Sequence, residues 1–276
     1  MSRVSRMPTM VGLCAVVAVV TAGFVGSARA HEFWIEPLDF TVPTGEAITA
    51  QNRIGQMLKG DVDPYIKSLF QTFTLTDEDG TRDVPGRLGD RPALNMKPRR
   101  EGLHIAAFQS KPSILRYRKQ EKFAKFARKE GFAWALEAHE KRGLPKDKFR
   151  EAYTRFAKSL IAVGEGAGND RALGLRIELV ALTNPYLDPG PMRVQVLFEK
   201  APLADVQIAI FRRDAENDVT RETLRTDDEG RAVIPEKGAA TTLLSAVHLV
   251  EPDEDLATKR KVVWHSLWAS LTYGAP

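Results

Sequence analysis

The chain has almost no cysteine, and the one it has lies near its start. Cys14 is the single cysteine among 276 residues, inside an apolar run from Val11 to Gly26. The remainder of the chain can therefore form neither a disulfide nor a thiolate metal site. Any tight transition-metal site in it must use histidines and carboxylates.

Long apolar runs after Gly26 and known catalytic motifs are also missing. No later run reaches the length of a membrane-spanning helix. The sequence contains no G-x-S-x-G, P-loop, dinucleotide-binding fingerprint or H-E-x-x-H motif. We therefore expect a soluble protein without a transmembrane segment in its mature form, and nothing in the motifs indicates an enzyme.

The first thirty residues have the features of a secretory signal peptide. Arg3 and Arg6 precede the apolar run, and Ala28 and Ala30 follow it in an A-x-A cleavage pattern. The pattern predicts a signal peptide over residues 1–30 and a periplasmic protein that begins at His31. Removing this leader lowers the net charge from +4 to +1, because it carries three arginines and no acid. We expect no nucleic-acid partner for such an exported protein.

The remaining 246 of the 276 residues read mainly as short strands between turn signals. Turns are indicated at Asp77–Gly80 and Asp227–Gly230. The fold class predicted is mainly β, with antiparallel β-sandwich domains. We expect an N-terminal β domain over 31–185 and a C-terminal β-sandwich domain over 186–276.

A helical insertion is predicted over 115–160 in the N-terminal part. Phe123, Phe126 and Ala127 recur at helical spacing, as do Phe149, Tyr153 and Phe156. From Arg116 to Lys158, fourteen Lys and Arg face six Asp and Glu, a net charge of +8. One interpretation is a pair of amphipathic helices packed on a sheet with a solvated basic face. The other is a docking surface for an acidic partner or for membrane headgroups.

Histidines supply the candidate metal ligands. Cleavage after Ala30 would free the α-amine of His31, which together with its imidazole can chelate one metal ion. His104 and His248 each interrupt an otherwise apolar strand. Taken together, the hypothesis is a site for a divalent transition metal at His31, His104 and His248, and the amino-terminal ligand suits copper. The alternative is that each is a hydrogen-bonded core or edge histidine.

The two other histidines are interpreted differently. His139 lies on the basic helical segment, and we expect it at the surface. His265 alternates with Trp264 and Ser266, so it should point to the opposite face of its strand from Trp264 and Trp268.

Several segments resemble a known family. They are HEFWIEP at the mature start, RALGLRIELVALTNPYL, VLFEKAPLADVQIAIFR with TDDEGRAVIP, and the ending SAVHLVEP…WHSLWASLTYG. The chain resembles exported bacterial proteins of unknown function once labelled NikM-like and grouped with periplasmic components of cobalt and nickel uptake. In that pattern histidines occupy positions 31, 104 and 248, and an acidic residue is expected where His265 stands. Residues 194–250 also resemble transthyretin-like, Cna-B-like or immunoglobulin-like sandwiches.

Three functions follow from these observations. The leading hypothesis is a soluble periplasmic binding or accessory protein for a divalent transition metal, linked to metal uptake through a membrane transporter or another envelope protein. A second is a metal-free β-sandwich module that binds a protein or glycan. A third is an oxidative copper enzyme that uses its amino-terminal histidine.

Overall fold

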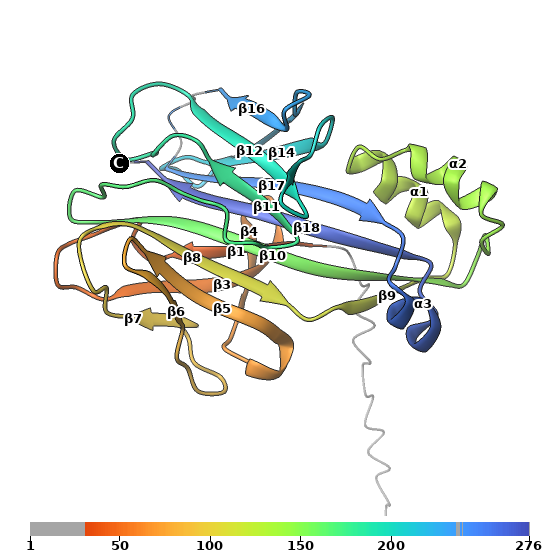
Figure 1. Ribbon diagram of the computed structural model, residues 1–276, viewed down its shortest axis with the longest axis horizontal. Coiled ribbons are helices and arrows are strands. Elements are labelled where there is room, and N and C mark those ends of the chain that lie inside the picture. The colour runs from red at the N-terminus through yellow and green to blue at the C-terminus, as the bar shows by residue number, and fades with distance from the viewer. Residues whose placement is uncertain (1–30, 236–237, 239, 276) are drawn as a thin grey trace, which may run out of the picture.

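The protein is mainly β, as the sequence predicted, and is built from several packed sheets. The computed structural model describes residues 31–235, 238 and 240–275 (Figure 1). The predicted signal peptide over 1–30 lies outside the described residues. Within those residues the strands are mostly antiparallel, and helices are few.

A ten-stranded sheet forms the middle layer. Its strands follow the order β15-β14-β17-β18-β10-β8-β5-β6, and β2 and β9 also pair with β10. In that order the strands are β15 (Val219–Arg225), β14 (Gln207–Arg213), β17 (Thr241–Val250), β18 (Trp264–Gly274), β10 (Phe149–Val163), β8 (Gly102–Ser110), β5 (Phe70–Asp77), β6 (Gly80–Asp83), β2 (Thr41–Val42) and β9 (Ser113–Tyr117).

Two smaller sheets cover opposite faces of the middle sheet. The C-terminal sheet comprises β11 (Ile177–Ala181), β12 (Met192–Phe198), β13 (Ala201–Pro202) and β16 (Arg231–Ile234). The N-terminal sheet comprises β1 (Glu32–Pro37), β3 (Ile48–Gln56), β4 (Lys59–Asp63) and β7 (Leu94–Met96). One core joins Leu179 and Val194 to Ile105 and Leu267, and a second joins Phe33 to Phe108 on the other face. Alternate residues of β8 thus enter different cores.

The structure corrects the prediction of a second helix that includes Phe149, Tyr153 and Phe156. These residues belong to β10, a strand of 15 residues at the centre of the middle sheet. Phe156 enters the core under the C-terminal sheet, whereas Phe149 enters the core under the helices. Because both faces of β10 are buried, its apolar residues do not alternate with polar ones, and helix-like spacing arose without a helix.

The helical part of the insertion is therefore shorter than the predicted 115–160. It consists of α1 (Gln120–Lys129) and α2 (Trp134–Lys141), which lie together at one end of the molecule (Figure 1). Phe123 and Ala127 of α1 and Ala135 of α2 are buried on the aromatic core over Trp264. The other helices are α3 (Glu254–Arg260) and one 3-10 turn, η1 (Lys67–Leu69). Within the described residues, no helix has the length and apolarity that crossing a bilayer requires.

The middle sheet crosses the predicted domain boundary at residue 185. β18, from the C-terminal part, pairs in parallel with β10 of the N-terminal part over nine residue pairs, from Glu151↔Trp264 to Ser159↔Thr272. Both parts thus contribute strands to one hydrogen-bonded sheet.

A buried ion cluster fastens the segment between β10 and β11 to the sheet. The Lys158 ammonium lies 2.7 Å from an Asp170 carboxylate oxygen and 3.9 Å from Glu178, and all three side chains are buried. The Asp170 carboxylate also accepts a hydrogen bond from the Ala181 main-chain amide, and the Glu178 carboxylate accepts hydrogen bonds from the main-chain amides of Leu173 and Gly174. The carboxylates are thus satisfied by main-chain donors as well as by the lysine.

Removing one member of this cluster should be strongly destabilising. In Asp170→Asn the buried Lys158 charge loses its nearest counter-ion, and we expect the free energy of unfolding to fall by about 3–5 kcal/mol. Glu137→Gln, which breaks an exposed pair with Lys141 on α2, is the control and should cost about 0.5 kcal/mol or less. Urea unfolding of both variants measures the difference. Equal midpoints would show that the cluster contributes nothing beyond a surface pair.

Candidate functional site

His104 is a fully buried residue of β8, and of its two ring nitrogens only Nδ1 has a hydrogen-bond partner among the described residues. Its Nδ1 lies 3.0 Å from the Gly102 carbonyl oxygen, and its Nε2 lies 3.8 Å from the Asp77 carboxylate. The Asp77 carboxylate in turn accepts a hydrogen bond from the guanidinium of Arg99. Burial lowers the pKa of His104, although the Gly102 carbonyl and Asp77 oppose this shift. The surroundings of His104 are those of a core histidine.

His248 lies elsewhere on the middle sheet and on its other face. It is half-buried on β17, and its ring centroid lies 4.6 Å from that of Phe198. The register places His248 level with Leu267 and Thr154, whereas His104 is level with Ile161. Positions 154 and 161 of β10 are about 23 Å apart along the strand. His104 and His248 therefore cannot ligate the same ion.

His31 occupies a third location, directly before β1. Arg155 of β10 donates a hydrogen bond to the His31 carbonyl oxygen at 3.4 Å. Arg155 is six residues along β10 from Ile161, the residue that pairs with His104. The predicted three-histidine site at His31, His104 and His248 is thus not assembled in the structure. Among the described residues, no three side chains of His, Asp or Glu are arranged to hold a metal ion. Apolar neighbours indicated that both internal histidines lie in strands, but register and face decide which residues meet.

The surroundings of His31 nevertheless form a pocket. A depression of about 540 Å³ is lined by His31 and by the hairpin of β3 and β4, including Asp61 and Asp63. Pairing of Ile54 with Asp61 and of Asn52 with Asp63 puts both aspartates on one face of the hairpin. The alternation of Asp61 and Asp63 in the sequence is the signal that could have identified them.

The hairpin under this pocket has a tightly constrained backbone. Gly55 and Gly60 face each other, and a Cβ on Gly55 would lie 2.1 Å from the Lys59 carbonyl oxygen. Only glycine fits such an approach. The turn residues Met57 and Leu58 both have positive φ, at 54° and 52°, which is costly for side chains of this size. Burial of Leu58 in a cluster with Trp34 holds the turn in place.

β1 is anchored on both sides, and this fixes the position of His31. Every residue from Glu32 to Pro37 is buried. Ser270 of β18 donates to the Phe33 carbonyl oxygen at 2.8 Å, and Glu36 forms ion pairs with Arg53 and Arg213. His31 therefore begins a rigid strand.

Charges of both signs surround the pocket. Burial raises the pKa of Asp63, and the Arg155 and Arg91 guanidinium groups partly offset that rise. Arg155 is held over the rings of Phe33 and Tyr153. The pocket thus contains one imidazole and two carboxylates, although these three side chains are not arranged as a metal cluster, and Arg155 and Lys59 limit its negative potential.

The structure confirms the predicted orientation of His265 and brings it close to His248. Trp264 and Trp268 enter the core beneath the helices, whereas Nε2 of His265 lies 2.9 Å from Thr154 Oγ1 on the other face. His265 pairs with Val250, so His248 is its diagonal neighbour across β17 and β18. Burial, assisted by Arg176, lowers the pKa of His265 to about 4. The nearby Arg176 guanidinium makes this histidine pair unfavourable for binding a cation.

The expectation that His139 lies at the surface is wrong. His139 is fully buried, its Nδ1 accepts the indole N–H of Trp264 at 2.9 Å, and its Nε2 donates to the Pro145 carbonyl at 3.0 Å. Its role is to bind α2 to β18. The basic residues around it in the sequence obscured this inward position.

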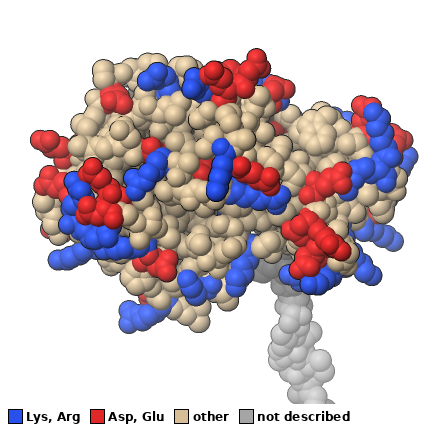
Figure 2. Space-filling model, viewed as in Figure 1, with Lys and Arg blue, Asp and Glu red and all other residues tan. Residues whose placement is uncertain are grey.

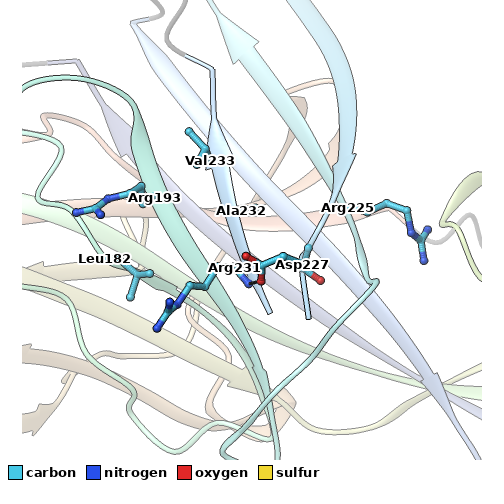
Figure 3. A pocket seen from close by; sticks show the side chains of 8 residues that line it. Leu182, Arg193, Arg225, Asp227, Arg231, Ala232 and Val233 are labelled. Atoms are coloured by element: carbon cyan, nitrogen blue, oxygen red, sulfur yellow. Dashed lines mark hydrogen bonds between the residues drawn. The ribbon is translucent and has the colours of Figure 1, made fainter. Parts of the chain in front are cut away.

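A second depression lies on the outer face of the C-terminal sheet and has a volume of about 630 Å³. Figure 3 shows that Arg193 and Arg225, which line it, point in different directions. Arg225 is paired with Asp205, and Arg231 with Glu229. Because its charged groups do not converge, this depression is a weaker candidate than the pocket at His31.

The chain belongs to a family of unknown function. Residues 28–250 match the family described as Domain of unknown function (DUF4198). No curated protein matches the chain. The predicted membership in an unknown-function family is thereby confirmed, and the match leaves the activity to be argued from the site.

The buried carboxyl group of Glu151 lies beneath the helices and has a strongly raised pKa. Glu151 accepts hydrogen bonds from Tyr117, at 2.8 Å, and from Ser266, which itself accepts the Trp268 indole N–H at 2.9 Å. The group is fully buried, and no ion pair to it occurs in the described part of the chain. Burial raises the pKa of Glu151 to about 7, against the effect of its two hydroxyl donors.

This group should make stability depend on pH. Between about pH 4.5 and 7 the folded protein keeps the Glu151 proton that the unfolded chain loses, so stability falls as pH rises. The expected loss is about 3 kcal/mol across that interval. Glu151→Gln should abolish this component and be more stable than wild type at pH 8. Thermal unfolding from pH 4 to 8 measures it, and parallel curves for the two proteins would contradict the assignment.

Proposed function

We propose that the protein is an exported accessory protein that carries a divalent transition metal at the His31 pocket. The observation that carries the proposal is the placement of His31 at the head of a buried strand, in one pocket with Asp61 and Asp63. This retains the function expected from the sequence but replaces His104 and His248 with carboxylates of β4.

The α-amine of His31 is the ligand that completes the proposed site. Side chains alone do not form a three-ligand cluster among the described residues. Cleavage after Ala30 would add an amine on the same residue as the imidazole, and two nitrogens of one residue form a chelate. With one carboxylate from Asp63 or Asp61, the set would contain two nitrogens and one oxygen, which suits copper, nickel or cobalt.

The charges around the pocket favour carriage of the metal over permanent storage. Arg155 lies against His31 and Asp63, and Lys59 lines the same pocket. These two positive groups repel a bound cation and so lower the affinity of the pocket for it. A metal held in an open pocket with moderate affinity can be passed to a transporter or another envelope protein.

The proposal predicts that metal affinity depends on a free amine at His31. We expect one Ni²⁺ to bind the chain that begins at His31, and binding to weaken at least tenfold in a chain that retains Ser27–Ala30 before it. That extension is long enough to keep the new amine out of a chelate with the His31 imidazole. Isothermal titration calorimetry with Ni²⁺ compares the two chains.

Substitutions separate the proposed site from the other histidines. Asp63→Asn should weaken Ni²⁺ binding several-fold in the chain that begins at His31, because it removes a carboxylate ligand. His248→Gln is the matched control and should bind as wild type does. Equal affinity for the two amino termini, or loss of binding in His248→Gln, would refute the His31 site.

A further inference from the structure

The end of the molecule that carries α1 and α2 has an excess of unmatched positive charge. Seven exposed cations of this region form no ion pair within the described part of the chain: Arg116, Arg118, Lys122, Lys125, Arg128, Lys146 and Lys148. We call these seven residues the basic surface. Figure 2 shows blue side chains around this end of the molecule, with red ones among them.

The acids of this region do not neutralise the basic surface. Glu137 is matched by Lys141, and Asp147 by Lys119. Two further exposed acids, Glu121 and Glu140, leave a net charge of +5 against the seven cations. The 246 residues from His31 onward carry a net charge of only +1, so the remainder of the protein is negative. The molecule is thus electrically polarised, with its positive end at the helices.

The basic surface comes from three chain segments at one end of the molecule. β9 pairs with β10 so that Tyr117 lies opposite Phe149, which places Arg118 beside the chain at Lys148. Asp147 contacts the Lys119 ammonium at 2.8 Å and accepts the Gln120 amide at the start of α1. Residues 122, 125 and 128 then extend the surface by about 9 Å along α1.

One exposed aromatic side chain belongs to α2, at the same end of the molecule as these cations. Trp134, the first residue of α2, is 53% exposed, and its ring packs edge-on against Trp264 at 6.1 Å. It is the one large hydrophobic residue of the two helices that is exposed to this extent among the described residues. An exposed tryptophan at a lysine-rich end of a protein is typical of surfaces that lie at the boundary between lipid headgroups and water.

We infer that the basic surface binds the protein to an anionic phospholipid membrane. A protein partner would favour an apolar centre with few lysines, since protein interfaces are depleted in Lys. The basic surface has the opposite composition, with four lysines, and a single exposed aromatic residue lies at the same end of the molecule. Flexible ammonium groups attract a layer of phosphates without requiring a complementary shape, and each one near such a layer strengthens binding about fivefold.

Sedimentation with vesicles tests this inference on the exported protein without added metal. We expect binding to vesicles of 30% phosphatidylglycerol in phosphatidylcholine, little binding to pure phosphatidylcholine, and release in 0.5 M NaCl because the attraction is screened. The variant Lys122→Gln/Lys125→Gln/Arg128→Gln should bind at least tenfold more weakly. Trp134→Ala should also weaken binding, but in a manner less sensitive to salt.

A control of equal charge distinguishes the surface from net charge. Lys67→Gln/Lys97→Gln/Arg193→Gln removes two lysines and one arginine that are exposed, form no ion pair in the described residues and lie outside the two helices. It should bind vesicles as wild type does, and so should His31→Ala. Equal weakening by the two triple variants, or no preference for phosphatidylglycerol, would overturn the inference. Binding to an acidic protein without binding to these vesicles would overturn it as well.

Discussion

The fold depends above all on the burial of β10 on both faces. This strand pairs in parallel with β18 and antiparallel with β8 and β9, so it joins chain segments more than a hundred residues apart. Its even-numbered residues, such as Phe156 and Leu160, enter the core under the C-terminal sheet. Its odd-numbered residues, such as Ala157 and Ile161, enter the core under the N-terminal sheet. The Lys158 side chain can be buried within this strand because its ammonium group forms ion pairs with Asp170 and Glu178.

The same double burial explains which parts of the fold the sequence could predict. Turns at Asp77–Gly80 and Asp227–Gly230 have local chemistry, and the strands beside them were recognisable. β10 lacks the alternation that marks a half-buried strand, so its aromatic residues matched a helical period instead. Its parallel pairing with β18 is set by packing far along the chain, and no local pattern encodes such a contact.

The candidate site shows the same division between local and distant information. The sequence indicated the chemistry of His31, because a histidine follows the predicted cleavage point. It could not show that Asp61 and Asp63 share a pocket with it, since this depends on the pairing of β1 with β3 and of β3 with β4. His104 and His248 looked equivalent because each is flanked by apolar residues. In the structure they lie on opposite faces of the middle sheet. His104 is on the same face of β8 as Phe108, whereas His248 is on the same face of β17 as Leu244 and Ala246.

The helices and the His31 pocket are close to each other, and this relates the two proposals physically. Lys129, in the last turn of α1, contacts the Glu32 carboxylate at 3.2 Å and the Glu130 carboxylate at 3.0 Å. Glu32 is the residue next to His31, so the end of α1 is fixed beside the start of β1. A protein held to a membrane through Lys122 and Lys125 would present its His31 pocket near the bilayer. Carriage of a metal in an open pocket is most useful there, because transfer to a membrane transporter requires the ion to cross only a short distance.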